Sequence, residues 1–146
     1  VAVFLSFDGE LDTQSLIEQL WRAGKRVYLP VLHPFSAGNL LFLNYHPQSE
    51  LVMNRLKIHE PKLDVRDVLP LSRLDVLITP LVAFDEYGQR LGMGGGFYDR
   101  TLQNWQHYKT QPVGYAHDCQ LVEKLPVEEW DIPLPAVVTP SKVWEW

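Results

Sequence analysis

The sequence predicts a single α/β domain built on a mostly parallel, Rossmann-like sheet with helices on both faces. Three observations support this fold class. Apolar runs of strand length alternate with amphipathic helical segments along the chain. Residues 1–32 read as strand, helix and strand, which is the order of a parallel βαβ unit with a right-handed crossover. The length of 146 residues suits one domain rather than two.

The first half of the chain is expected to open with a strand over residues 1–7, an apolar run typical of a strand buried on both faces. A helix follows and ends at Gly24. Residues 27–32 and 40–45 read as the next two strands, and residues 46–70 as a long loop with one or two short turns. The apolar face of the helix consists of residues at helical spacing: Leu16, Ile17, Leu20 and Trp21.

The second half of the chain alternates strands with a glycine-rich loop and a short helix. Ligands in open α/β sheets bind beyond the carboxyl ends of the strands, so we expect residues 6–10, residues 84–96 and His117 to meet there. The expected elements are a central strand at 75–79, an apolar continuation at 81–84, a turn at 85–88, a helix at 97–105, and late strands at 113–116 and 136–139.

The loop between Arg90 and Asp99 gives the strongest functional signal. Glycine lacks a Cβ, so a loop rich in glycine can turn several backbone N–H groups toward one anion just before a helix begins. No lysine and hydroxyl follow the glycines as a Walker A loop requires, and Phe97 stands where the dinucleotide fingerprint needs a glycine. Apolar neighbours argue against a flexible surface loop. We therefore predict a phosphate-binding loop formed by Gly92, Met93, Gly94, Gly95 and Gly96.

Charged and aromatic residues beside this loop have two interpretations each. Arg90 is either a surface charge or a fork-shaped donor to phosphate oxygens. Asp99 either complements the helix dipole or binds Mg²⁺ next to a polyphosphate. Phe97 and Tyr98 are either core aromatics or ligand contacts.

The composition narrows the classes of partner. A net charge of −5 offers no basic surface for nucleic acid. No apolar run approaches the roughly 18 residues of a membrane span, and no signal peptide is recognisable. The single cysteine, Cys119, excludes an internal disulfide and suits a reducing cytoplasm. We expect a cytoplasmic monomer that acts on a small molecule and binds neither nucleic acid nor membrane.

A long motif in this region resembles a known enzyme family. The motif comprises Asp85, Gly88, Arg90-Leu91-Gly92, Gly94 and Gly96-Phe97-Tyr98-Asp99. It resembles the signature of the 5-formyltetrahydrofolate cyclo-ligase family, also called methenyltetrahydrofolate synthetases. The resemblance extends over most of the chain, from Phe4-Leu5-Ser6 to Val137-Val138-Thr139-Pro140.

The resemblance implies an ATP-dependent enzyme that converts 5-formyltetrahydrofolate to 5,10-methenyltetrahydrofolate and releases ADP and phosphate. It implies that Asp99 and Asp131 bind Mg²⁺, that Leu5 and Glu10 contact the folate substrate, and that Tyr98 contacts both substrates. Arg90 and Tyr98 are the expected catalytic residues, and residues 92–99 the expected nucleotide-binding segment. The string Ile58-His59-Glu60-Pro61 resembles another folate-side segment, to which we assign no role.

The sequence differs from the family pattern in two places. Met93 and Gly95 stand where some members have basic residues, which leaves the backbone amides and Mg²⁺ to hold the phosphates. The family normally begins with a basic helical segment that reaches the nucleotide, whereas this sequence opens at Val1 without it, so we expect a truncated or processed polypeptide. The alternative function is therefore a non-catalytic nucleotide- or phosphate-binding domain that has lost part of the ATP site.

Overall fold

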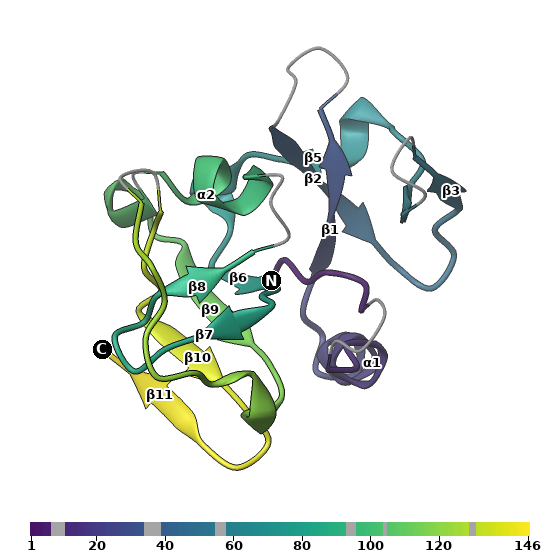
Figure 1. Cartoon of the computed structure of the whole chain (residues 1–146). Coiled ribbons are helices and arrows are strands. Elements are labelled where there is room, and N and C mark those ends of the chain that lie inside the picture. Colours follow the sequence, from purple (N-terminus) through teal and green to yellow (C-terminus); the bar gives the residue numbers. More distant parts are fainter. Residues whose placement is uncertain (7–10, 34–38, 55–57, 93–95, 104, 129–130) are drawn as a thin grey trace.

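The computed structural model describes residues 1–6, 11–33, 39–54, 58–92, 96–103, 105–128 and 131–146, and its elements are labelled in Figure 1. The helices are α1 (Gln14–Arg22) and α2 (Phe97–Leu102), with short 3₁₀ turns at Val65–Asp67, Leu71–Arg73, Trp105–His107 and Asp118–Gln120. The strands are β1 (Val27–Leu32), β2 (Leu40–Tyr45), β3 (Leu51–Met53), β4 (His59–Pro61), β5 (Val68–Leu69), β6 (Val76–Thr79), β7 (Ala83–Phe84), β8 (Arg90–Leu91), β9 (Gln111–Tyr115), β10 (Ala136–Val138) and β11 (Val143–Glu145).

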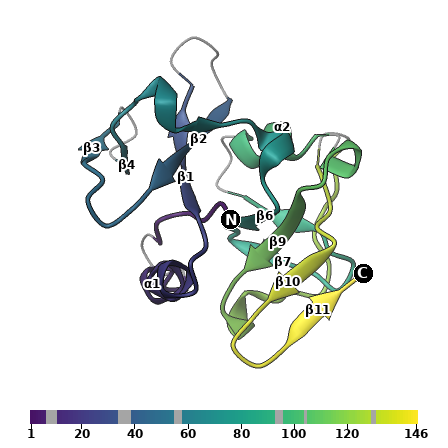
Figure 2. The ribbon, with the colours of Figure 1, turned by 180° about the vertical axis from the view of Figure 1, so that it is seen from behind.

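A mixed sheet runs through the molecule in two groups of strands joined by the N-terminal segment. The first group has the order β5-β2-β1 and the second has the order β6-β9-β10-β11. Ala2 bridges both groups, because it pairs in parallel with Tyr28 of β1 and with Leu77 of β6. Seen from behind in Figure 2, the N-terminus accordingly lies between β1 and β6.

Pairing is parallel in the middle of this sheet and antiparallel toward its ends. β6, β9 and β10 are parallel, whereas β2, β5 and β11 each run antiparallel to their neighbours. Two strands that follow each other in the chain can pair in parallel only if a crossover connection of about a dozen residues or more joins them. The connections at 33–39 and 139–142 are too short for one, so the chain turns back antiparallel. The α/β class is confirmed, but a mostly parallel, Rossmann-like sheet is not.

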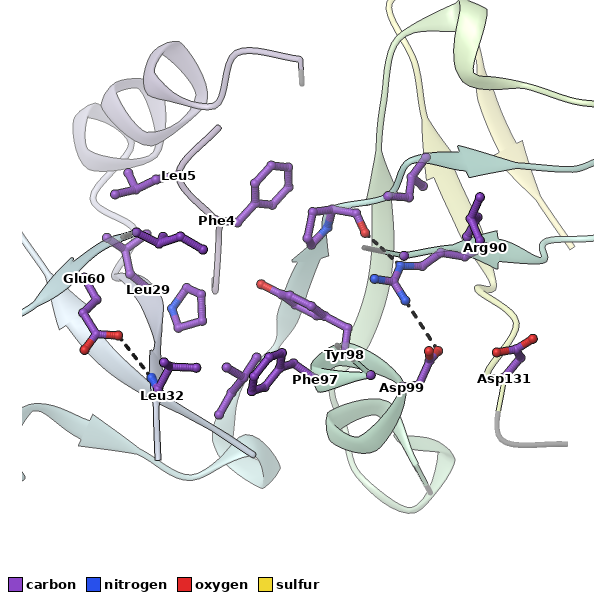
Figure 3. Close-up of a pocket in the computed structure, with 18 of the residues that line it drawn as sticks. Phe4, Leu5, Leu29, Leu32, Glu60, Arg90, Phe97, Tyr98, Asp99 and Asp131 are labelled. Carbon is purple, nitrogen blue, oxygen red and sulfur yellow. Dashed lines mark hydrogen bonds and ion pairs between the residues drawn. The ribbon is translucent and has the colours of Figure 1, made fainter. Parts of the chain in front are cut away.

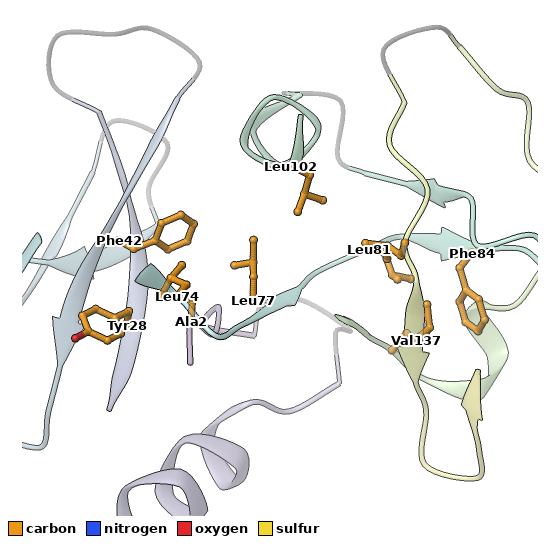
Figure 4. Packing of buried hydrophobic residues seen from close by; sticks show 11 residues of the cluster. Ala2, Tyr28, Phe42, Leu74, Leu77, Leu81, Phe84, Leu102 and Val137 are labelled. Atoms are coloured by element: carbon orange, nitrogen blue, oxygen red, sulfur yellow. The ribbon is translucent and has the colours of Figure 1, made fainter. Parts of the chain in front are cut away.

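Side chains of the central strands divide between two faces, because successive residues of a strand point in opposite directions. Leu102 of α2 packs on one face, as Figure 4 shows. Ile17 of α1 packs on the other, so helices cover both faces as expected. The α2 face includes Ala2, Tyr28, Leu77 and Leu81. The α1 face includes Val3, Val27, Leu29 and Ile78.

Three expectations about secondary structure were wrong. Residues 46–70 contain β3, β4 and β5 rather than a long loop, because Pro61 lies at the end of its strand opposite Leu51, where proline is tolerated. The first strand is reduced to the bridge at Ala2 within the described part of residues 1–7. The helix expected at 97–105 ends at Leu102.

Within the described residues, no helix combines the length and apolar character needed to cross a membrane.

Candidate active site

A cavity of about 720 Å³ opens between the two groups of strands. Leu32 is the last residue of β1, Pro80 directly follows β6, and Leu5 follows the segment of Ala2. The cavity therefore lies at the carboxyl ends of the parallel strands, as expected. His117 does not line it. The lining residues are Phe4, Leu5, Leu29, Pro30, Leu32, Leu40, Asn54, Ile58, His59, Glu60, Pro80, Leu81, Arg90, Leu91, Gly92, Gly96, Phe97, Tyr98, Asp99, Leu125, Pro126, Glu128 and Asp131.

Arg90 forms the centre of the polar end of the cavity (Figure 3). Its side chain is only 5% exposed. The Nε group donates to the Pro80 carbonyl at 2.8 Å, and Nη1 lies 3.5 Å from Oδ1 of Asp99. Burial lowers the pKa of the Arg90 guanidinium from its ordinary value, while the Asp99 charge opposes that effect. The side chain is therefore a fixed, partly desolvated cation facing the cavity.

Two carboxylates, Asp99 and Asp131, line the same end. Asp99 comes from the first turn of α2, and its side chain is 17% exposed. Oδ2 of Asp131 accepts a hydrogen bond from the Glu128 backbone N–H at 2.8 Å, which orients the carboxylate. Each of these carboxylates has a second oxygen to which the described residues supply no hydrogen bond. Among the described residues, no group of three or more His, Cys, Asp or Glu could hold a metal ion.

Both ends of the glycine loop reach the cavity, while Met93, Gly94 and Gly95 lie outside the described residues. A Cβ on Gly92 would come within 2.9 Å of Nη2 of Arg90. Gly96 precedes α2 with a φ of +69°, a left-handed conformation that favours glycine. These glycines let the chain pass close against two arginine side chains, Arg90 and Arg100.

The opposite end of the cavity is apolar and contains one oriented carboxylate. Oε2 of Glu60 accepts hydrogen bonds from the Leu32 backbone N–H at 3.1 Å and from Nδ2 of Asn54 at 3.0 Å. These bonds fix the acid beside apolar walls, as Figure 3 shows. Among the apolar walls here are Phe4, Leu5, Leu29, Leu32 and Ile58.

Tyr98 stands between the two ends of the cavity. Its ring centroid is 5.5 Å from Cζ of Arg90, within the range of a cation–π contact. The hydroxyl points away from Asp99 toward the apolar side in Figure 3. One aromatic side chain therefore touches the cationic group and faces the apolar end.

A small hairpin, β7–β8, carries Arg90 into the cavity. Asp85 lies in its turn with 0% exposure and accepts three backbone hydrogen bonds. Oδ1 receives the N–H groups of Tyr87 at 2.9 Å and Gln89 at 3.0 Å, and Oδ2 receives that of Leu125 at 2.9 Å. The carboxylate thus closes the turn and ties it to the segment that precedes Asp131.

The chain matches the model of the 5-formyltetrahydrofolate cyclo-ligase family over residues 1–140. It is 99% identical over 146 residues to the 5-formyltetrahydrofolate cyclo-ligase of Escherichia coli K12, covering 100% of this chain and 80% of that protein. The chain belongs to the 5-formyltetrahydrofolate cyclo-ligase family. The Haemophilus influenzae cyclo-ligase is 60% identical over 134 residues, covering 92% of this chain and 72% of that protein.

Solved structures of cyclo-ligase relatives support the fold. The 5,10-methenyltetrahydrofolate synthetase of Aquifex aeolicus superposes with a TM-score of 0.80 at 30% identity, covering 99% of this chain and 70% of that one. The Mycoplasma pneumoniae synthetase gives a TM-score of 0.68 at 21% identity, covering 93% and 70% of the two chains, and supports the fold alone.

Most of the residues that the sequence indicated for a cyclo-ligase site meet at the cavity. The lining includes Leu5, Arg90, Gly92, Gly96, Phe97, Tyr98, Asp99 and Asp131. Glu10 lies outside the described residues, as do Met93, Gly94 and Gly95. The roles of all these residues remain predictions.

Sequence reasoning missed two parts of the site. It gave no role to Glu60, although the resemblance of Ile58-His59-Glu60-Pro61 to a folate-side segment was a usable signal. It could not find the Pro80 carbonyl, because a backbone acceptor leaves no trace in residue type. Asp85 was recognised within the family motif, but its role in the turn follows only from the structure.

Replacing Asp85 with alanine is expected to lower the free energy of unfolding by about 3 kcal/mol or more, because three backbone N–H groups lose a charged acceptor. Urea unfolding followed by circular dichroism measures the change. Glu86→Ala is the matched control in the same turn, since the residue is exposed and the change should stay within about 0.5 kcal/mol. Equal stability of the two variants would contradict this account.

Proposed function

We propose that this chain catalyses the ATP-dependent cyclisation of 5-formyltetrahydrofolate to 5,10-methenyltetrahydrofolate, with release of ADP and phosphate. One observation carries the proposal: in a member of the cyclo-ligase family, one cavity joins an apolar end with an oriented carboxylate to a polar end with a buried arginine and two aspartates. The first end suits a flat heterocycle that carries N–H donors, and the second suits a polyphosphate.

The proposed reaction has two steps. The formyl oxygen attacks the γ-phosphorus of ATP, and the bond from that phosphorus to the bridging oxygen of ADP breaks. The neighbouring folate nitrogen, N10, then attacks the formyl carbon, its proton is lost, and phosphate leaves with the former formyl oxygen. Phosphoryl transfer depends mainly on alignment and charge stabilisation, so the two substrates must meet in one cavity.

Arg90 is proposed to bind the transferring phosphate. Pro80 fixes Nε and Asp99 faces Nη1, so the guanidinium is held in one orientation before a ligand arrives. Nη2 lies on the side of Gly92, where the phosphate-binding loop begins. A cation in a partly desolvated setting interacts with a phosphate more strongly than one in water. Tyr98 is proposed to contact both substrates from its place between the ends of the cavity.

The polar end is chemically suited to Mg²⁺. This ion typically takes one or two carboxylates and completes its shell with phosphate oxygens and water. Asp99 and Asp131 supply two carboxylates at the same end of the cavity, each with an oxygen that accepts no bond from the described residues. When bound, the ion would neutralise phosphate charge, and the protein's part is to hold these two side chains in place.

The folate is proposed to occupy the apolar end. Leu5 contributes to the apolar wall there, and Glu60 is oriented to accept hydrogen bonds from ring N–H groups. Glu10, which lies outside the described residues, is proposed as a further folate contact. In this proposal, the formyl group faces Tyr98 and Arg90.

We further propose that the enzyme is a cytoplasmic monomer that binds neither nucleic acid nor membrane. The exposed thiol of Cys119 suits a reducing compartment, and the net charge of −5 disfavours binding to nucleic acid or to anionic lipid.

The decisive test mixes the chain with 5-formyltetrahydrofolate and MgATP and follows the absorbance of the methenyl product. Turnover that requires both substrates is the expected result. Nucleotide binding without product, measured by calorimetry with MgADP, would instead favour a non-catalytic nucleotide- or phosphate-binding domain. Absence of both would contradict the proposed function.

Asp99→Asn is expected to reduce Mg²⁺-dependent turnover by about 100-fold or more, since a neutral amide is a poor ligand for a hard cation. Initial rates over a Mg²⁺ titration measure the effect, and the fold is checked by circular dichroism. Asp75→Asn is the control: it neutralises an exposed carboxylate, 74% accessible and paired with Lys109, and should leave the rate unchanged. If Asp99→Asn turned over at the wild-type rate, the assignment of Asp99 as a Mg²⁺ ligand would be wrong.

Glu60→Gln is expected to raise KM for 5-formyltetrahydrofolate by about tenfold while KM for ATP changes little, because a charged acceptor is lost only at the folate end. Steady-state kinetics with each substrate varied in turn separates the two constants. Glu50→Gln, an exposed acid paired with Lys62, serves as the control. Equal increases in both KM values would argue against a folate-specific role for Glu60.

A further inference from the structure

We infer that Trp146 is a positioning residue for the nucleotide end of the cavity, acting through the β7–β8 turn on Arg90. The inference rests on the proposed function, because it assumes that Arg90 binds the phosphates of ATP. Trp146 does not line the cavity. Its effect must therefore pass through a chain of contacts, which can be followed residue by residue.

The first link joins Trp146 to the turn between β7 and β8. The indole N–H donates to the carbonyl of Glu86, and the ring stands 3.1 Å from the position that a Cβ on Gly88 would occupy. The backbone N–H of Trp146 donates to the Pro135 carbonyl at 2.9 Å, which fixes the end of the chain against the same region. Figures 1 and 2 both show the C-terminus beside this turn.

The second link fixes the shape of the turn. Gly88 has a φ of +81°, and a Cβ there would lie 2.6 Å from the carbonyl of Leu134. The Gly88 carbonyl accepts the Leu134 N–H at 2.8 Å. Inside the turn, Asp85 binds the N–H groups of Tyr87 and Gln89. Asp85 thus holds the turn from within, and the segment from Leu134 to Trp146 holds it from outside.

The third link connects the turn to Arg90, two residues after Gly88. Arg90 pairs with Phe84 in a hairpin of only two residue pairs. Hairpins this short have little stability of their own, so outside contacts decide where the strand lies. A shift of the turn moves the Arg90 backbone while Pro80 still holds Nε. The guanidinium would then tilt relative to Gly92 and Asp99.

A comparison with the neighbouring Trp144 distinguishes a positioning role of Trp146 from a role in packing the core. Trp144 packs against the core and meets the Phe84 ring edge-on at 5.9 Å, so it contributes to stability. Trp146 is 44% exposed and stacks on Trp144 with centroids 6.4 Å apart. Loss of the Trp146 ring therefore removes less buried surface, while it removes both contacts with the turn.

The experiment is a double-mutant cycle that combines Trp146→Ala with Arg90→Met in the full chain. KM for ATP of Trp146→Ala is expected to rise about tenfold, with KM for 5-formyltetrahydrofolate within about twofold of wild type. In the Arg90→Met background, Trp146→Ala should have no further effect on kcat/KM for ATP, because its target is already absent. Val143→Ala, at an exposed position of β11, is the control and should match the wild type.

Trp146→Phe keeps an aromatic ring over Gly88 and loses only the indole donor. Its KM for ATP should therefore lie much closer to that of the wild type than the KM of Trp146→Ala does. This variant also keeps the test valid if the alanine variant unfolds. Equal changes in both KM values, or an effect of Trp146→Ala that persists without Arg90, would overturn the inference while the wild type stays active. Failure of the proposed function is distinct: the wild type itself would then neither turn over nor bind MgADP, and the inference would fall with it.

Discussion

Arg90 holds a positive charge in a largely buried position, and the surrounding structure meets the requirements of that charge. With 5% of its side chain exposed, the guanidinium loses most of its hydration and needs fixed partners. Pro80 provides a carbonyl from the end of β6, and Asp99 provides a carboxylate from α2. Three separate elements, the end of β6, strand β8 and helix α2, must therefore be placed together before the charge is accommodated. The rest of the guanidinium faces the cavity, where the proposed function places a phosphate.

The architecture of the sheet explains why one cavity has two chemically different ends. Ala2 joins two groups of strands, so the carboxyl ends of β1 and β6 flank a single opening. The β1 side brings apolar side chains and Glu60, and the β6 side brings the hairpin with Arg90 and the start of α2. A cavity with these two different ends suits a reaction that must align a heterocyclic substrate with a polyphosphate.

The sequence predicted local elements better than it predicted how they assemble. The helix at α1 and strands β1, β2, β6, β9 and β10 follow from apolar periodicity, which is a property of neighbouring residues. The mixed sheet does not follow from it, because strand direction depends on the lengths of the connections and on pairing partners. The hairpin of β3 and β4 was missed for a related reason: Pro61 indicated a break, but pairing at the end of a strand tolerates proline.

The sequence by itself predicted most of the chemistry of the polar end, because the motif from Arg90 to Asp99 contains its arginine, its flanking glycines and one of its two aspartates in one continuous segment. Tertiary structure alone decided what surrounds that segment. Glu60 gains its orientation from Leu32 and Asn54, and Arg90 gains its anchor from the Pro80 carbonyl. Such contacts join segments far apart in the chain or involve the backbone, which every residue shares, so residue type cannot specify them before the fold brings the partners together.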